Sequence, residues 1–245
     1  MPRAASRAEP TTEPAYRVPD APTIGGSLRE SLVDFYFNSW RLVPANIVWG
    51  VLLLAIAAAT LAWLPAILLT SLLALPAAGL YRMAALITRG APVGFRDFIT
   101  GMRRFAGPAL LLGIASVVVG AVFTANIGLG MAQGTLAGGV FAVLALYADL
   151  ALAIYLVAAW PIVVDPVRET MSFRGRLQLA FYVVVSKFGR LLGLTLILLA
   201  ILLVSAILFA ALVTISIAYI SLVGTRYVLP AADRLEGRPT MPLPG

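Results

Sequence analysis

The sequence contains no cysteine and no histidine among its 245 residues. Their absence excludes disulfides, thiol redox chemistry, thiolate or imidazole metal sites, and the Ser-His and Cys-His pairs of nucleophilic catalysis. A metal site built from oxygen ligands alone would need clustered carboxylates, and the 11 acidic residues are scattered along the chain. We therefore expect no metal site, no cofactor and no enzymatic activity.

Charged residues are also scarce, at 12% of the chain, whereas 61% of the residues are apolar. Soluble domains contain about 45–50% apolar and about 25% charged residues. A soluble domain of this size could not keep so much hydrocarbon away from water. The composition therefore predicts an all-α, polytopic integral membrane protein whose main partner is the lipid bilayer.

Three long tracts, 42–81, 105–148 and 191–225, contain no charged residue at all. A helix rises 1.5 Å per residue and the hydrocarbon core is about 30 Å thick, so the first tract is long enough to cross twice. Turns are expected at Trp63-Leu64-Pro65, in the glycine-rich segment 133–139, and near 210–214. These turns predict six membrane spans, which would form three hairpins: 44–62, 65–88, 108–131, 139–163, 190–210 and 212–229.

The last charge-free tract is too long for one upright span and slightly short for two, so the basic residues decide its division. All 18 Lys and Arg fall in four segments: 3–41, 82–104, 168–190 and 226–238. Six crossings place all four segments on one face, which the positive-inside rule makes cytoplasmic. The formal charge of +7 then reflects membrane topology, and we expect no nucleic acid partner. The prediction is a multi-pass plasma-membrane protein with both termini in the cytoplasm.

Proline-rich ends flank the apolar region. Residues 1–26 are predicted to be a disordered cytoplasmic tail, 27–229 the membrane domain, and 230–245 a second cytoplasmic tail.

An amphipathic segment precedes each hairpin, which predicts three interfacial helices on the cytoplasmic surface and three similar units. The alternative is that these segments carry ordinary helix-start signals, such as a Ser27–Glu30 capping box. The segments begin at Ser27-Leu28-Arg29-Glu30, Gly94-Phe95-Arg96-Asp97 and Ser172-Phe173-Arg174-Gly175.

Three polar residues are candidates for binding a substrate. Asp149 is the one acidic residue within an apolar stretch, where a charged carboxylate costs at least about 2.5–3.5 kcal/mol. It would be a proton or cation site, or else a neutral carboxyl that bonds a neighbouring helix. Asn126 lies in the third predicted span, and Asn46 lies near the start of the first. Each of these asparagines would either bind a ligand or lock two helices together. Arg82 would hold an anionic group or extend to lipid phosphate.

A stripe of small residues follows one face of the third predicted span. Such stripes allow two helices to approach closely, and the partner helix can belong to the same chain, to a second copy or to another protein. The stripe consists of Gly113, Ser116, Gly120, Thr124 and Gly128.

Three motifs lie within residues 28–110: Asn46-Ile47-Val48-Trp49-Gly50, Pro76-Ala77-Ala78-Gly79-Leu80-Tyr81-Arg82, and Arg89-Gly90-Ala91-Pro92-Val93-Gly94-Phe95-Arg96-Asp97-Phe98. Through these motifs the stretch resembles the YesL-like family of bacterial membrane proteins. That family has no established activity, and its members often accompany carbohydrate uptake systems. The resemblance implies an accessory role in sugar import or use, with permease subunits of an ABC transporter as partners.

Three functions therefore compete. The favoured one is a non-catalytic accessory to carbohydrate uptake, and the second is a small-solute or ion-coupled transporter centred on Asp149. An enzyme acting on lipid or prenyl substrates is third, since it would need Asp97, Asp165 and Glu169 to converge at the cytoplasmic surface.

The predicted topology can be tested directly, because the chain has no native cysteine. A cysteine placed at position 235 should react with a membrane-impermeant thiol reagent only after the cells are permeabilised. A cysteine at position 133, in the predicted outer loop, should react in intact cells. Labelling of position 235 in intact cells would contradict six crossings.

Overall fold

The computed structural model describes residues 22–238, and every regular element within that range is helical. The all-α prediction is confirmed. The elements, in chain order, are α1 (Ile24–Ala62), η1 (Leu64–Leu73), α2 (Ala74–Thr88), α3 (Phe95–Arg104), α4 (Ala106–Ala132), α5 (Leu136–Val163), η2 (Pro166–Arg168), α6 (Phe173–Ser186), α7 (Phe188–Ile207), α8 (Phe209–Ala211), η3 (Leu212–Ser216) and α9 (Ile217–Leu235).

Six helical stretches in the described part of the chain are long and apolar enough to cross a membrane. The turns between them lie at or near the predicted places. Trp63 separates α1 from η1, which has Pro65 in its first turn, and Gly134 joins α4 to α5 with a φ of +61° that favours glycine. The third turn falls at Leu208, slightly before the predicted 210–214. The stretches are Ile24–Ala62, Leu64–Thr88, Ala106–Ala132, Leu136–Val163, Phe188–Ile207 and Phe209–Leu235.

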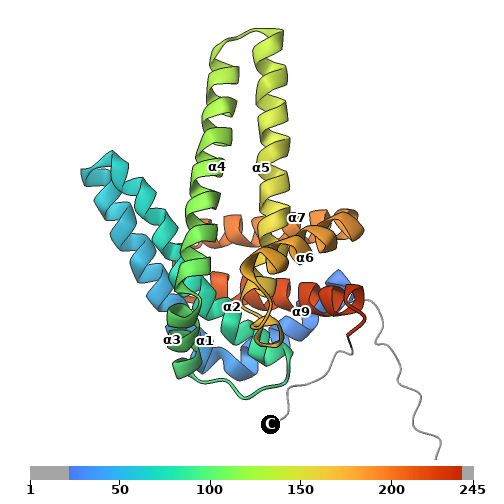
Figure 1. Cartoon of the computed structure of the whole chain (residues 1–245). Helices are drawn as coiled ribbons and strands as arrows, with labels where there is room; N and C mark the ends of the chain where they lie inside the picture. Colours follow the sequence, from blue (N-terminus) through green and yellow to red (C-terminus); the bar gives the residue numbers. More distant parts are fainter. Residues whose placement is uncertain (1–21, 239–245) are drawn as a thin grey trace, which may run out of the picture.

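The apolar helices do not form one parallel bundle (Figure 1). The α4–α5 hairpin projects well beyond the rest of the structure, while α1 and η1 make a second arm that leans away from it. Only 11% of the residues in the most apolar stretch of α4, and 17% in that of α5, are buried, against 56% in the last apolar helix. The body of the protein is therefore assembled around α9, and α4 and α5 form an arm.

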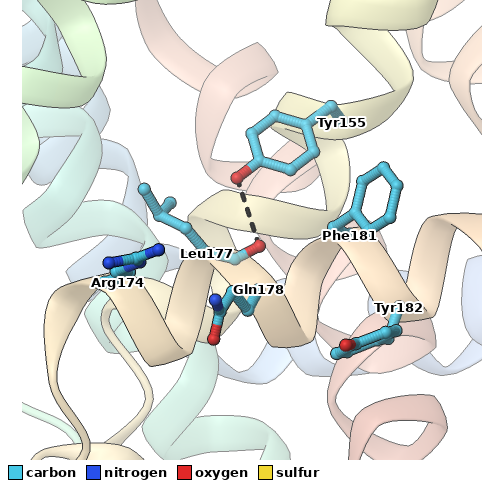
Figure 2. A pocket seen from close by; sticks show the side chains of 6 residues that line it. All are labelled: Tyr155, Arg174, Leu177, Gln178, Phe181 and Tyr182. Atoms are coloured by element: carbon cyan, nitrogen blue, oxygen red, sulfur yellow. Dashed lines mark hydrogen bonds between the residues drawn. The ribbon is translucent and has the colours of Figure 1, made fainter.

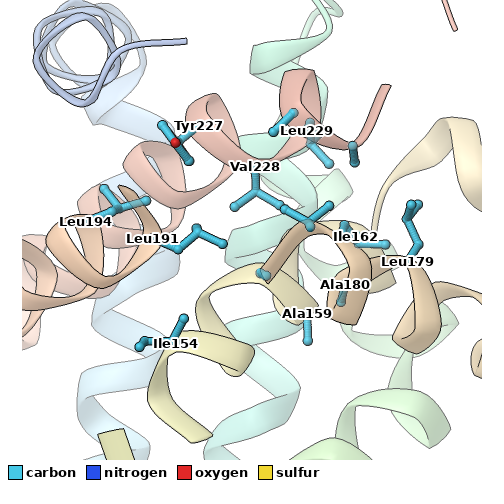
Figure 3. Close-up of a cluster of buried hydrophobic side chains, with 14 of the residues drawn as sticks. Ile154, Ala159, Ile162, Leu179, Ala180, Leu191, Leu194, Tyr227, Val228 and Leu229 are labelled. Carbon is cyan, nitrogen blue, oxygen red and sulfur yellow. The ribbon is translucent and has the colours of Figure 1, made fainter. Parts of the chain in front are cut away.

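Helix α9 is central because it packs against α1, α2, α5 and α6. Its apolar side chains lie in the largest buried cluster, where they meet side chains of α5, α6 and α7 (Figure 3). Burial of each such side chain is worth about 1.5–3 kcal/mol where water is the alternative environment. The cluster includes Ile154, Ala159, Ile162, Leu179, Ala180, Leu191, Leu194, Tyr227, Val228 and Leu229.

Asn46 joins α1 to the start of α9. A π-helical turn, η3, changes the backbone hydrogen bonding just before α9. The Asn46 amide nitrogen donates to the carbonyl oxygens of Val213 (2.7 Å) and Leu212 (3.2 Å), and its oxygen accepts from the Ala218 N–H (2.8 Å). Gly50 permits the close approach, since a Cβ there would lie 2.8 Å from the Val213 carbonyl oxygen. The predicted helix-locking role of Asn46 is confirmed.

The first amphipathic segment is not a separate helix. Helix α1 runs unbroken from Ile24 through Pro44 to Ala62, and contacts with α9, including the Arg226–Asp34 ion pair, hold its N-terminal part. The predicted Ser27–Glu30 capping box is wrong, because Thr23 caps the helix by accepting from the Gly26 N–H (3.1 Å). By contrast, α3 and α6 are separate helices, as predicted.

The N-terminal part of α1 points its large apolar side chains outward, whereas Ser27 and Ser31 are buried. These outward side chains are each at least half exposed, so this face is suited to contact lipid and not the protein core. They are Leu32, Val33, Tyr36, Phe37 and Trp40.

The predicted boundary of the C-terminal tail at residue 230 is several residues too early. Helix α9 continues through Pro230 to Leu235, and Asp233 in its last turn is buried. Ion pairs made by Asp233 and Glu236 hold these last turns against the body. Most of the predicted N-terminal tail, 1–21, and residues 239–245 lie outside the described part of the chain.

Candidate functional site: a buried ion-pair network

Two arginines and two aspartates form a closed ring of ion pairs at the base of the structure. Arg89 contacts Asp165 (Nη2–Oδ2, 2.7 Å) and Asp233 (Nη1–Oδ2, 2.6 Å). Arg168 contacts the same two carboxylates, with an Nη2–Oδ1 distance of 2.7 Å to Asp233. All four side chains are at least 95% buried, and their charges balance. We call these four residues the charge ring.

Three separate parts of the chain supply the charge ring. Arg89 follows the last turn of α2, and Gly90, with a φ of 72°, then turns the chain away. Asp165 begins the short helix η2, where its carboxylate also accepts from the Val167 N–H (3.3 Å), and Arg168 ends that helix. Asp233 comes from the last turn of α9. The ring therefore ties together the ends of α2, α5 and α9.

Further ion pairs extend the charge ring outward. Glu236 accepts from Arg168 (2.6 Å) and lies near Arg238 (3.4 Å). Glu169 pairs with Arg82 (2.6 Å) and with Arg104 of α3. The pairs to Glu169 connect α2, α3 and the α5–α6 connection at the same end of the molecule.

Two arginines also bind carbonyl oxygens near the end of α5. Arg82 donates to the Val164 carbonyl (3.0 Å), and Arg176 of α6 donates to the carbonyls of Val163 and of Met171 (3.1 Å). Cations are favourable at a helix C-terminus, where carbonyl oxygens lack helical partners. Arg176 thereby holds α6 against the end of α5.

Burial and ion pairing shift the pKa of the arginine side chains in opposite directions. Burial alone would lower the pKa of Arg89, but hydrogen bonds and charge interactions with Asp233 and Asp165 outweigh it and raise the pKa above its usual value. Arg89 therefore stays a cation at every pH at which the protein can be handled. Burial lowers the pKa of Arg176, and the charges of Glu169 and Asp165 oppose this effect.

The charge ring is suited to hold the fold together. Removing one partner of a buried ion pair typically costs about 3–5 kcal/mol, because the other charge is left buried and uncompensated. The alternating ring leaves each carboxylate flanked by two guanidinium groups. Within residues 22–238, no group of three or more acidic side chains is placed to hold a metal ion.

Each of the three acidic residues of the enzyme hypothesis has a structural partner. Asp165 belongs to the charge ring and Glu169 is paired with two arginines. Asp97 accepts from the Gly94 N–H (2.7 Å) and caps α3. These contacts give each of the three carboxylates a role in holding the fold.

The three predicted substrate-binding residues lie in different places. Asp149 and Asn126 are partly exposed on α5 and α4, and neither makes a hydrogen bond or ion pair within residues 22–238. Arg82 contacts Val164, which follows Asp149 by 15 residues, or about 22 Å of helix. Arg82 is also turned inward and pairs with Glu169. The structure does not assemble these residues into one site.

The stripe of small residues is divided along its length. At the base, Gly113 packs tightly, since a Cβ there would lie 2.8 Å from the Ser71 carbonyl oxygen, and the Ser116 hydroxyl bonds to its own helix. Gly120 faces Asp149, because a Cβ on this glycine would lie 3.9 Å from the Asp149 Oδ1. Further out, Thr124 is exposed, and a Cβ on Gly128 would have no neighbour within 4 Å.

Comparison with known protein families, with curated proteins and with solved structures finds no match to this chain. The YesL-like resemblance stays a prediction that rests on the residues quoted for it.

If the charge ring holds the fold together, replacing one of its arginines by an uncharged residue should greatly lower the stability. Arg168→Met should lower the free energy of unfolding in detergent by about 3–5 kcal/mol, because it leaves Asp165 and Asp233 short of a cation. The measurement is thermal or denaturant unfolding. Arg103→Met removes an exposed arginine of α3 and serves as the matched control, with a change of less than about 0.5 kcal/mol. Equal effects of the two substitutions would contradict this role.

Proposed function

We propose that this protein is a non-catalytic accessory of the membrane, which acts by contact between its α4–α5 arm and another membrane protein. The observation that carries the proposal is the arm itself. It extends away from a body that is held together by buried ion pairs, and little of it is covered by the rest of the chain (Figure 1).

The outer half of α4 is suited to a helix partner. Large apolar side chains of α4, such as Val118 and Val122, are about half exposed and are suited to contact lipid. Thr124 and Gly128 offer little apolar area to lipid, but small residues let a second helix approach closely, where packing and weak hydrogen bonds favour association. The uncovered part of the stripe thus supports contact with a transmembrane helix from outside this chain.

The partner that we propose is a permease subunit of a carbohydrate ABC transporter. This choice is supported by the resemblance of residues 28–110 to a family whose members accompany carbohydrate uptake systems. The alternative partner is a second copy of this chain.

Capture from native membranes tests the proposal. The tagged protein should co-purify with permease subunits, and Gly128→Leu should reduce their recovery at least fivefold because it fills the surface needed for close approach. Gly139→Leu is the matched control, since Gly139 lies on α5 near the same tip and also has open space around it. Purification of the chain alone, with unchanged sugar uptake after deletion of its gene, would contradict the proposal.

The second candidate function is a small-solute or ion-coupled transporter. It is favoured by Asp149, a partly exposed carboxyl in an apolar helix that makes no ion pair within the described residues. An ionisable group in such a place is costly to keep and is often part of a proton or ion path.

The transporter alternative makes its own prediction. Asp149→Asn should abolish pH-dependent uptake by proteoliposomes, because the amide cannot exchange a proton. Tyr147→Phe, which removes a hydroxyl from an exposed side chain of the same helix, is the comparison that reports a general effect on the arm. Uptake that is unchanged by Asp149→Asn would exclude this mechanism.

A further inference from the structure

The segment 170–190, which comprises α6 and the start of α7, contains four cations and no acidic residue: Arg174, Arg176, Lys187 and Arg190. Two of them, Arg174 and Arg176, belong to α6. Arg176 is turned inward to the Val163 carbonyl oxygen at the end of α5, whereas Arg174 is exposed. The outward surface of α6 therefore presents one cation, Arg174, and no acidic residue.

An open groove of about 450 Å³ lies between α6 and the side of α5 (Figure 2). Tyr155 of α5 closes one side, and its hydroxyl donates to the Leu177 carbonyl oxygen (3.2 Å). The lining contains one cation, Arg174, and no carboxylate. The six lining residues are Tyr155, Arg174, Leu177, Gln178, Phe181 and Tyr182.

The groove has a polar end and an aromatic end. Arg174 and Gln178 lie one turn apart on the exposed face of α6, and both carry N–H donors. Phe181 and Tyr182, which are 56% and 62% exposed, lie at the other end. Exposed aromatic side chains of this kind are typical of the membrane–water interface, where the rings meet the lipid headgroups.

We infer that this groove binds the headgroup of an anionic phospholipid. The Arg174 guanidinium and the Gln178 amide supply donors for the phosphate oxygens, and Phe181 and Tyr182 contact the glycerol and the upper acyl chains. A soluble phosphate compound would gain nothing from the exposed aromatic rings, so the groove favours a lipid. Because the groove contains the cation Arg174 and no carboxylate, it favours a lipid with net negative charge over a zwitterionic one.

Helix α3 provides an internal comparison. Arg96 occupies the second position of α3, as Arg174 does in α6, and it is also exposed. The next residue in α3 is Asp97, whose carboxylate lies in the same turn, whereas Gly175 follows Arg174. Arg96 is therefore a matched control with the same type of charge and a similar position.

The test is titration of the delipidated, detergent-solubilised protein with phosphatidylglycerol and, separately, with phosphatidylcholine, with bound lipid counted by native mass spectrometry. One interfacial cation is worth enough to weaken binding about fivefold when it is lost. Arg174→Gln should therefore weaken phosphatidylglycerol binding about fivefold and phosphatidylcholine binding less, because the choline cation already offsets the phosphate charge of the second lipid. Arg96→Gln should change neither. An unchanged unfolding temperature for both variants shows that the fold is kept.

A third variant and a soluble competitor complete the test. Tyr182→Ala should also weaken phosphatidylglycerol binding, whereas excess glycerol phosphate should not displace the lipid. Equal binding of the two lipids, equal effects of Arg174→Gln and Arg96→Gln, or full displacement by glycerol phosphate would each overturn the inference.

Discussion

The charge ring of Arg89, Asp165, Arg168 and Asp233 is the interaction on which the rest of the structure depends. It joins the ends of α2, α5 and α9, which come from three parts of the chain that are far apart in sequence. Four buried charges are costly to remove from water, and only an arrangement that pairs each of them can offset this cost. The ring therefore requires that the three chain ends meet in one geometry.

The charge ring holds one end of the molecule together, whereas the outer part of the α4–α5 arm is not packed against the rest of the chain that the structure describes. Ion pairs through Glu169 and carbonyl contacts through Arg176 add α3 and α6 to the same end, so the surface helices, the last turns of α9 and the connections between hairpins form a single base. The α4–α5 arm extends from this base with most of its apolar surface uncovered. A base held together by ion pairs, with an exposed apolar arm, is suited to contact with lipid.

The sequence predicts the helices well and the charge ring not at all. Span positions follow from apolar length and turn residues, which are local properties, and the Asn46 contact follows from the cost of an amide in an apolar helix. The tail is predicted to begin at residue 230 because the C-terminal end is rich in proline, whereas the ion pairs of Asp233 hold α9 in place to Leu235. Asp233 lies in a basic segment and Asp165 lies three residues before one, so each carboxylate has an arginine nearby to pair with. That pattern is visible in the sequence, but the identity of each pair depends on tertiary packing.

A double-substitution cycle between Arg89 and Asp233 tests the central claim most directly. The free energy of unfolding in detergent is measured for the unsubstituted chain, for Arg89→Met, for Asp233→Leu and for the pair. If the two residues belong to one ring, the double substitution should cost less than the sum of the single ones, by more than the roughly 0.5 kcal/mol within which distant sites add. Additive losses would contradict the account.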